Sequence, residues 1–215
     1  MSHGPLSLPA RLCLLAWDTA RPAVNDTAQL PGLVRAGALV DLARRGLLTD
    51  EDGIATPADL DSRTGDAVLD GLLELIHESR PHSWRTWVTL RARVTLDAVR
   101  EQLVAEGWLR AEKRRVLGVF PSVEYALERA AAVDALRRET RQVLAGSVPV
   151  AEVSERDAAL AALGAAAELF GGACARGRRA GELAGRAGAA SPALRGIVTE
   201  VWGAVATAVP APASP

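Results

Sequence analysis

Apolar side chains at three- and four-residue spacing, in segments closed by glycine, most constrain the fold. Residues 33–45 place an apolar stripe on one helical face, and Gly46 follows directly. Residues 94–106 repeat the pattern with Leu96, Val99 and Leu103 before Gly107. Glycine adopts the left-handed conformation that commonly ends a helix. The chain is therefore predicted to be mainly α.

The same criteria divide the rest of the chain. Helices are expected over residues 6–17, 33–45, 65–78, 84–90, 94–106 and 123–144, and across 155–205 with breaks near Gly171-Gly172 and Ser191-Pro192. Ser83 is a candidate cap. Residues 18–32 are expected to be irregular, and residues 47–54 and 108–121 to form strands or hairpins. The predicted fold class is mainly α: a single globular helical domain over 6–206 with one or two short β-hairpins, and flexible tails at 1–5 and 207–215.

Composition narrows the possible environments and partners. The 215 residues suffice for a proper core, and a net charge of −1 argues against a general nucleic-acid binder. Cys13 and Cys174 lie far apart and form neither a disulfide framework nor a zinc pattern, which fits a reducing cytoplasm. The most apolar stretch, 158–167, is too short to span a bilayer, and the N-terminal residues do not resemble a signal peptide. We expect a cytoplasmic protein whose membrane contact is peripheral.

Motifs for catalysis or metal binding are missing from the sequence. It contains no nucleophile elbow, phosphate-binding Walker loop or dinucleotide fingerprint. His3, His77 and His82 are not spaced as metal ligands, and the acidic run 50–52 lacks the spacing of a calcium loop. We therefore expect no enzymatic activity, no cofactor and no metal.

The basic residues are almost all arginine, and Lys113 is the only lysine. Together with abundant Ala, Gly, Val and Leu, this bias is typical of high-GC coding and suggests a bacterial source. Guanidinium groups nevertheless favour forked contacts with phosphate and carboxylate groups.

Four segments, in order, carry a resemblance to a known family. They are LVRAGALVDLARRGLL (33–48), RTGDAVLDGLLELI (63–76), VREQLVAEGWLRAEK (99–113), and the C-terminal pattern that begins RDAALAAL (156–163) and ends VWGAV (201–205). Together they resemble the Golgi phosphoprotein 3 family over residues 6–206.

The resemblance implies a helical adaptor. Family members in eukaryotes bind phosphatidylinositol 4-phosphate and the cytosolic tails of Golgi glycosyltransferases, and an apolar hairpin contributes to membrane insertion or self-association. By this resemblance Arg35 and Arg100 are the candidate lipid-headgroup residues. The candidate membrane or oligomer hairpin comprises Val116, Leu117, Val119 and Phe120. The implied partners are an anionic phospholipid, membrane-protein tails and a second copy of the chain.

The sequence departs from the family pattern at two site positions. Asp97 stands where the family has a basic residue, one helical turn before Arg100, and Val24 stands where it has a tryptophan before Asn25-Asp26. Asp97 would repel a phosphate or would pair with Arg100 at i,i+3. A structural ion pair is therefore the alternative to phosphate binding, and the headgroup identity stays open.

Neighbouring residues offer a second basic set. Arg91, Arg93, Arg110, Arg114 and Arg115 flank the region, and with Trp84, Trp87 and Trp108 they resemble a membrane-facing surface. The alternative is that the tryptophans are core residues and the arginines are solvated. The apolar hairpin can likewise be an ordinary buried strand.

Three functions follow from these patterns. The leading one is a peripheral membrane adaptor that binds anionic phosphoinositide-type headgroups. A protein–protein scaffold without lipid binding is the second. The third is a winged-helix-like DNA-binding regulator, because a helix ending in Arg44-Arg45-Gly46 precedes a small hairpin and residues 101–119 offer a second such unit. The acidic residues of the first hairpin and the near-neutral charge oppose it.

Overall fold

The computed structural model describes residues 6–18, 23–24, 28–59, 61–116, 120–170 and 177–208. These residues are mainly helical with short antiparallel hairpins, as the sequence predicts. The helices are α1 (Leu8–Leu15), α2 (Leu30–Arg44), α3 (Ala67–Glu78), α4 (Trp84–Thr89), α5 (Ala92–Ala105), α6 (Ala130–Ala145), the 3₁₀ turn η1 (Val150–Glu152), α7 (Glu155–Ala166), α9 (Arg178–Ala187) and α10 (Pro192–Ala208). The strands are β1 (Trp17–Asp18), β2 (Ala23–Val24), β3 (Leu48–Glu51), β4 (Ile54–Pro57), β5 (Leu109–Val116) and β6 (Phe120–Leu127).

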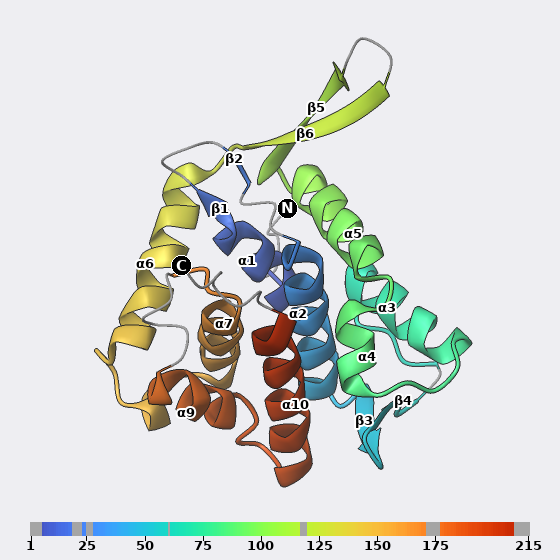
Figure 1. Cartoon of the computed structure of the whole chain (residues 1–215), viewed down its shortest axis with the longest axis vertical. Helices are drawn as coiled ribbons and strands as arrows, with labels where there is room; N and C mark the ends of the chain where they lie inside the picture. The colour runs from blue at the N-terminus through green and yellow to red at the C-terminus, as the bar shows by residue number, and fades with distance from the viewer. Residues whose placement is uncertain are drawn as a thin grey trace, which may run out of the picture.

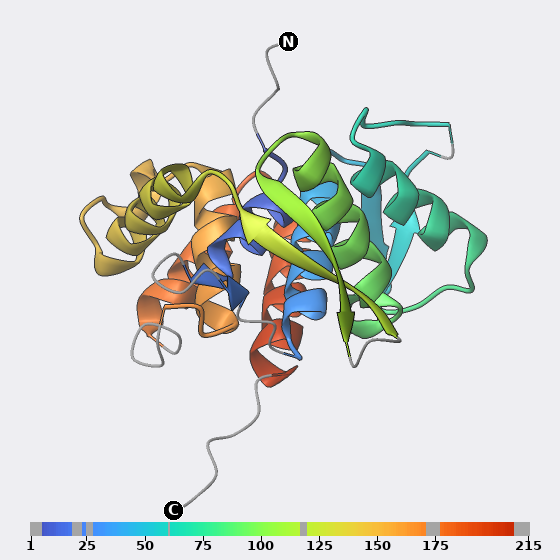
Figure 2. The same ribbon diagram turned by 90° about the horizontal axis from the view of Figure 1, so that it is seen from above.

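Helix α2 is the centre of the molecule. Of its residues from Leu33 to Ala43 every one is buried, on all faces of the helix. Helices α3, α4 and α5 lie on one side of α1 and α2, and α6, α7 and α9 lie on the other (Figure 1; Figure 2). A helix that is apolar around its whole circumference must be enclosed by other elements. The sequence of α2 therefore dictates its central place.

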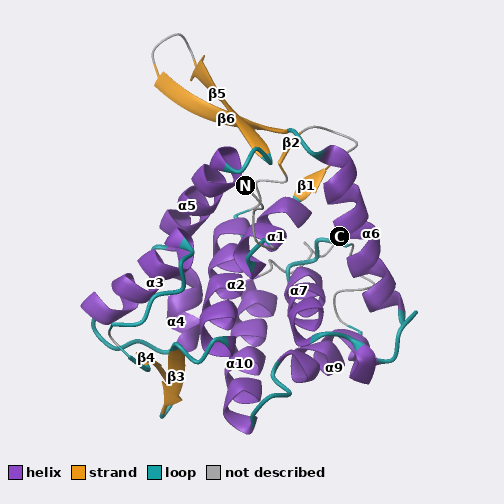
Figure 3. Cartoon of the chain, turned by 180° about the vertical axis from the view of Figure 1, so that it is seen from behind, coloured by secondary structure: helices purple, strands orange, loops and turns teal. Residues whose placement is uncertain are grey.

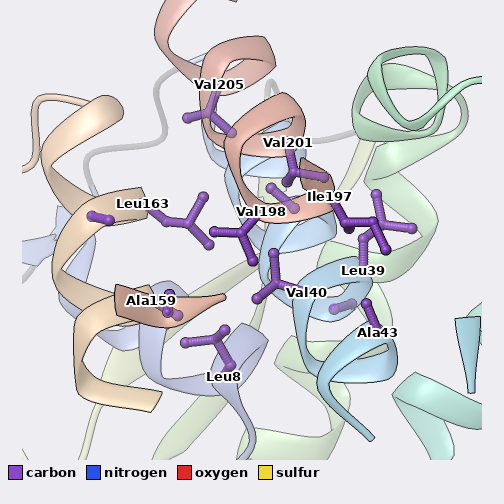
Figure 4. Close-up of a cluster of buried hydrophobic side chains, with 14 of the residues drawn as sticks. Leu8, Leu39, Val40, Ala43, Ala159, Leu163, Ile197, Val198, Val201 and Val205 are labelled. Carbon is purple, nitrogen blue, oxygen red and sulfur yellow. The ribbon is translucent and has the colours of Figure 1, made fainter. Parts of the chain in front are cut away.

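The core forms where α1, α2, α7 and α10 meet. Figure 4 shows Leu8, Val40, Leu163 and Val198, one from each of these helices, with their side chains gathered in one cluster. All four are at most 1% exposed. Burying each such side chain contributes about 1.5–3 kcal/mol relative to exposure. This packing joins the first and last helices of the chain to α2.

Local sequence signals set the ends of the helices. The Asp66 carboxylate accepts the N–H groups of Val68 and Leu69 at the start of α3, and the Ser83 hydroxyl accepts the N–H of Thr86 at the start of α4. Gly46 ends α2 with φ of 73°, and Gly107 ends α5 with φ of 71°. The predicted cap and both predicted glycine stops are confirmed.

The two longer hairpins, β3–β4 and β5–β6, lie at opposite ends of the helical body. β3–β4 lies at one end and β5–β6 projects from the other, with helices between them (Figure 3). The register of β5–β6 runs from Leu109 opposite Leu127 to Val116 opposite Phe120. The predicted helix over 123–144 is therefore wrong in its first part. Residues 123–127 pair as β6, and α6 starts only at Ala130.

Other predicted boundaries also change. Helix α2 begins at Leu30 rather than 33, because Pro31 occupies a first-turn position, where a helix does not need its N–H. The predicted irregular stretch 18–32 contains the two-residue ladder β1–β2. Thr207 and Ala208, predicted as part of a tail, end α10. Residues 1–5, 209–215 and the Gly171-Gly172 break lie outside the described residues.

None of the described helices is both long and apolar enough to cross a membrane.

One close approach between α9 and α10 gives a stability prediction. A Cβ added at Gly188 would lie 2.4 Å from the Cα and 2.7 Å from the N of Arg195, both of them backbone atoms. Gly188→Ala should therefore lower the free energy of unfolding by about 1–3 kcal/mol, the usual cost of overpacking. Chemical denaturation measures this change.

Gly185 in the same helix is the matched control. A Cβ added there meets nothing within 4 Å. Gly185→Ala should be neutral or should stabilise by up to about 1 kcal/mol, because alanine favours the helix. Equal effects of the two substitutions would contradict the proposed packing of α9 against α10.

Candidate functional site

Arg35 lies in the interface between α2 and α5. Its side chain is 0% exposed. The Nε–H donates to Oγ1 of Thr95 at 2.7 Å, and Nη2 donates to the carbonyl oxygen of Arg91 at 2.9 Å. Both acceptors belong to the first turn of α5 or its cap, so Arg35 links the central helix to the start of α5.

The charge on Arg35 lacks a compensating anion. Among the described residues no carboxylate lies within ion-pair distance of it, and its Nη1 has no hydrogen-bond partner. Burial lowers the pKa of Arg35 to about 10, so the guanidinium stays charged at neutral pH. A buried, incompletely satisfied cation is costly, and such groups concentrate at functional sites.

Arg91 forms a strained turn over this charge. Its φ is 51°, in the left-handed region that residues other than glycine seldom adopt, and its side chain is exposed. As the N-cap residue of α5 it makes no side-chain cap bond. The strained backbone presents its carbonyl oxygen to Arg35. Strain of this kind persists where the surrounding structure imposes it, and it clusters at binding sites.

An open groove of about 490 Å³ borders the same turn. Arg91 and Arg93 line it, and both are exposed. The remaining walls come from the start of α2, the end of α4 and the end of α10, and they include the apolar side chains of Leu33, Val88 and Val205. The groove therefore combines two exposed arginine side chains with apolar lining residues.

Arg100 lies further along α5 in a different environment. It is 8% exposed, and its guanidinium carbon lies 5.3 Å from the centre of the Tyr125 ring on β6. Burial raises the pKa of Tyr125, whereas the Arg100 charge lowers it and Asp97 raises it. Thr95 and Arg100 are separated by a rise of about 7.5 Å along the helix.

Arg35 and Arg100, the predicted headgroup pair, therefore lie at separate points along α5: Arg35 reaches the start of α5 from α2, and Arg100 belongs to α5 itself. The contacts of Arg35 are with Thr95 and the Arg91 carbonyl, and Arg100 stacks on Tyr125. Both guanidinium groups are buried, while Asp97 is exposed. The side chain of Val24 in β2 lies outside the described part of the chain. Thr95 was missed, although its place beside Leu96 on the buried stripe of α5 was a usable signal.

The members of the second basic set whose side chains the structure describes do not form a single membrane-facing surface. Trp84 and Trp87 are 0% exposed, so they are core residues and not membrane-facing ones. Trp108 is half-buried, and the Arg129 guanidinium lies 4.8 Å from its ring. Arg110 is paired with Glu128 at 2.6 Å and with Glu112 at 2.9 Å. Arg91 and Arg93 are the members that stand exposed beside a groove.

Parts of the predicted site lie outside the described residues. Val116 ends β5 and Phe120 begins β6, but their side chains are not described, and neither are Leu117 and Val119. The side chains of Arg114 and Arg115 are likewise outside. Within the described ranges no group of three or more His, Cys, Asp or Glu side chains is placed to hold a metal ion.

The fold and this site define a class: a mainly helical protein with a buried arginine beneath a basic, apolar-floored groove. The chain belongs to the Golgi phosphoprotein 3 (GPP34) family, whose model matches residues 8–201. This match confirms the resemblance found in the sequence and includes every residue of the α2–α5 interface described above. Comparison with curated proteins finds no matching relative.

The Arg35–Thr95 bond can be tested by an isosteric change. Thr95→Val removes the oxygen that accepts the Arg35 Nε–H while it preserves the side-chain shape. Because hydrogen bonds to charged groups contribute about 1.5–3 kcal/mol, unfolding free energy should fall by that amount. Denaturant titration measures the loss.

Thr95→Ser keeps the hydroxyl and should lose only about 1 kcal/mol for the missing methyl group. In an Arg35→Leu background, the loss caused by Thr95→Val should shrink, as a double-mutant cycle requires. An undiminished loss in that background would show that Thr95 stabilises the fold independently of Arg35.

Proposed function

We propose that this protein is a peripheral membrane adaptor that binds anionic phospholipid headgroups of the phosphoinositide type and acts by binding rather than by catalysis. The observation that carries the proposal is the buried Arg35 guanidinium, which has an unsatisfied nitrogen and no described carboxylate partner. A phosphate near this charge would supply the anion that the protein itself does not.

Arg91 and Arg93 make the first contact with the headgroup. Both side chains are exposed at the groove, whereas Arg35 has no exposed surface. Two guanidinium groups can fork onto one phosphate with charge-assisted hydrogen bonds. Arg35 holds the Arg91 carbonyl from behind, so it fixes the turn and adds positive potential to the site.

The groove walls suit the rest of a phospholipid. Ala28, Pro31 and Ala208 offer exposed or partly exposed apolar groups next to the two arginines, whereas Leu33, Val88 and Val205 in the same lining are at most 4% exposed. A headgroup phosphate and the glycerol and upper acyl region therefore meet complementary surfaces. Basic side chains with adjacent apolar groups are a common means of binding an anionic membrane surface.

Charge, more than headgroup shape, sets the affinity in this proposal. The family's basic residue is replaced by Asp97, which is exposed on α5. Asp97 precedes Arg100 by about one helical turn on α5, and its charge raises the pKa of Tyr125 whereas the Arg100 charge lowers it. We therefore expect a modest preference for phosphatidylinositol 4-phosphate over other anionic lipids. The same adaptor role includes membrane-protein tails as partners and self-association through the β5–β6 hairpin.

A DNA-binding role finds less support in the fold. In the winged-helix interpretation α2 would enter a DNA groove, but α2 is enclosed on all faces from Leu33 to Ala43. The hairpin that follows it carries Asp50, Glu51 and Asp52, which would repel phosphates. A scaffold without lipid binding is the outcome that a negative membrane experiment would favour.

Vesicle co-sedimentation of the full chain tests the proposal. Arg91→Gln/Arg93→Gln should weaken binding to phosphatidylcholine vesicles that contain phosphatidylinositol 4-phosphate. Each basic residue near an anionic surface contributes about 1 kcal/mol, so the partition coefficient should fall about thirtyfold. Vesicles with phosphatidylserine at equal total charge measure the headgroup preference.

Arg138→Gln/Arg178→Gln is the matched control. Both residues are exposed, on α6 and α9, and the change in net charge is identical. This variant should sediment with vesicles almost as wild type does. Absence of wild-type binding at low salt would remove the lipid proposal, and equal losses in the two variants would remove the site.

A further inference from the structure

A second groove, on the other side of α1 from the headgroup site, has its own charge pattern. It measures about 570 Å³, within the usual size of small-molecule sites. Its walls come from residues before and within α1, the end of α5, the face of α6 and the first turn of α7. Figure 1 shows α6 and α7 on the side of α1 away from α3 and α4.

One wall of this groove is apolar. Leu6, Trp108 and Leu136 line it together with two alanines of α6. Trp108 is held in place, because the Arg129 guanidinium lies over its ring and also donates to the carbonyl oxygen of Glu106 at 3.0 Å. The aromatic wall is therefore already formed before any ligand binds.

Three arginines line the groove, and two of them are already engaged. Arg11 is paired with Asp157 at 2.9 Å. Arg129 is held by Trp108 and the Glu106 carbonyl. These two guanidinium groups are committed to the protein.

Arg156 is the third and differs from both. Within the described residues it has neither an ion pair nor a hydrogen bond, although its side chain is only partly exposed. Burial, followed by repulsion from Arg11 and more weakly from Arg44, lowers the pKa of Arg156, although the nearby Asp41 and Asp157 act in the opposite direction. An anion in the groove would relieve both effects, since it would pair with the charge and offset the nearby Arg11.

We propose that this groove binds a small amphipathic anion, whose carboxylate or phosphate pairs with Arg156 and whose apolar chain lies against Leu6, Trp108 and Leu136. Two carboxylates also line the groove and oppose an anion: Glu139, which is exposed, and Glu106, which is partly buried. The proposal therefore predicts opposite effects for neutralising Arg156 and Glu139. It is independent of the headgroup site, which uses Arg91 and Arg93.

Isothermal titration calorimetry of the full chain with octanoate and octyl phosphate tests the site. Both should bind, and Arg156→Gln should weaken them at least about tenfold, the loss expected for one charge-assisted hydrogen bond. Glu139→Gln should tighten binding. Whichever of the two probes binds more tightly identifies the anionic group, and octanol and inorganic phosphate should each bind far more weakly than octyl phosphate.

Two controls distinguish this groove from other arginines. Arg138→Gln, exposed on α6, should bind the probes as wild type does, and the loss of affinity caused by Arg156→Gln should persist in an Arg91→Gln/Arg93→Gln background, in which the headgroup site is removed. Thermal unfolding verifies that Arg156→Gln is folded. Unchanged affinity when Arg156→Gln is added to folded Arg91→Gln/Arg93→Gln, or equal binding of octanol and octanoate, would overturn the proposal.

Discussion

The buried contact of Arg35 with α5 is the interaction on which the site depends. Helix α2 is enclosed on every side, yet it carries a guanidinium at its centre. This group fixes α5 through Thr95 and holds the strained Arg91 turn by its carbonyl. The turn in turn displays Arg91 and Arg93 at the groove. A single buried charge thus connects the core of the molecule to the exposed arginines of the groove.

Elsewhere arginine has a structural role that explains part of its abundance. Arg137 donates to the carbonyl oxygens of Leu15 and Trp17, at and just after the end of α1. Arg179 donates to those of Val143 and Val148, at and just after the end of α6, and Arg186 donates to that of Val153. These guanidinium groups satisfy carbonyl oxygens that a helix end leaves without partners. Arg35, which is fully buried and has no carboxylate partner among the described residues, and Arg156, which forms no ion pair with them, are the two arginines for which we propose an anion as partner.

Local signals in the sequence predicted much of the fold. The stops at Gly46 and Gly107 and the cap at Ser83 depend on a few adjacent residues, and each was correctly placed. Residues 123–127 were predicted as helix because their pairing with β5 is a contact between distant residues. Arg35 was identified by family resemblance, but neither its burial nor its bond to Thr95, sixty residues away, has a local signature.

The central claim is that an anionic headgroup is bound at the Arg35–Arg91 turn. NMR of arginine side-chain N–H signals, with the protein titrated by the water-soluble headgroup glycerophosphoinositol 4-phosphate, tests it directly. The account predicts saturable shifts of the Arg91 and Arg93 signals and a coupled shift of the buried Arg35 Nε–H, with Arg138 and Arg178 unmoved. Equal chemical-shift changes at all exposed arginines, or no change at Arg35, Arg91 and Arg93, would contradict it.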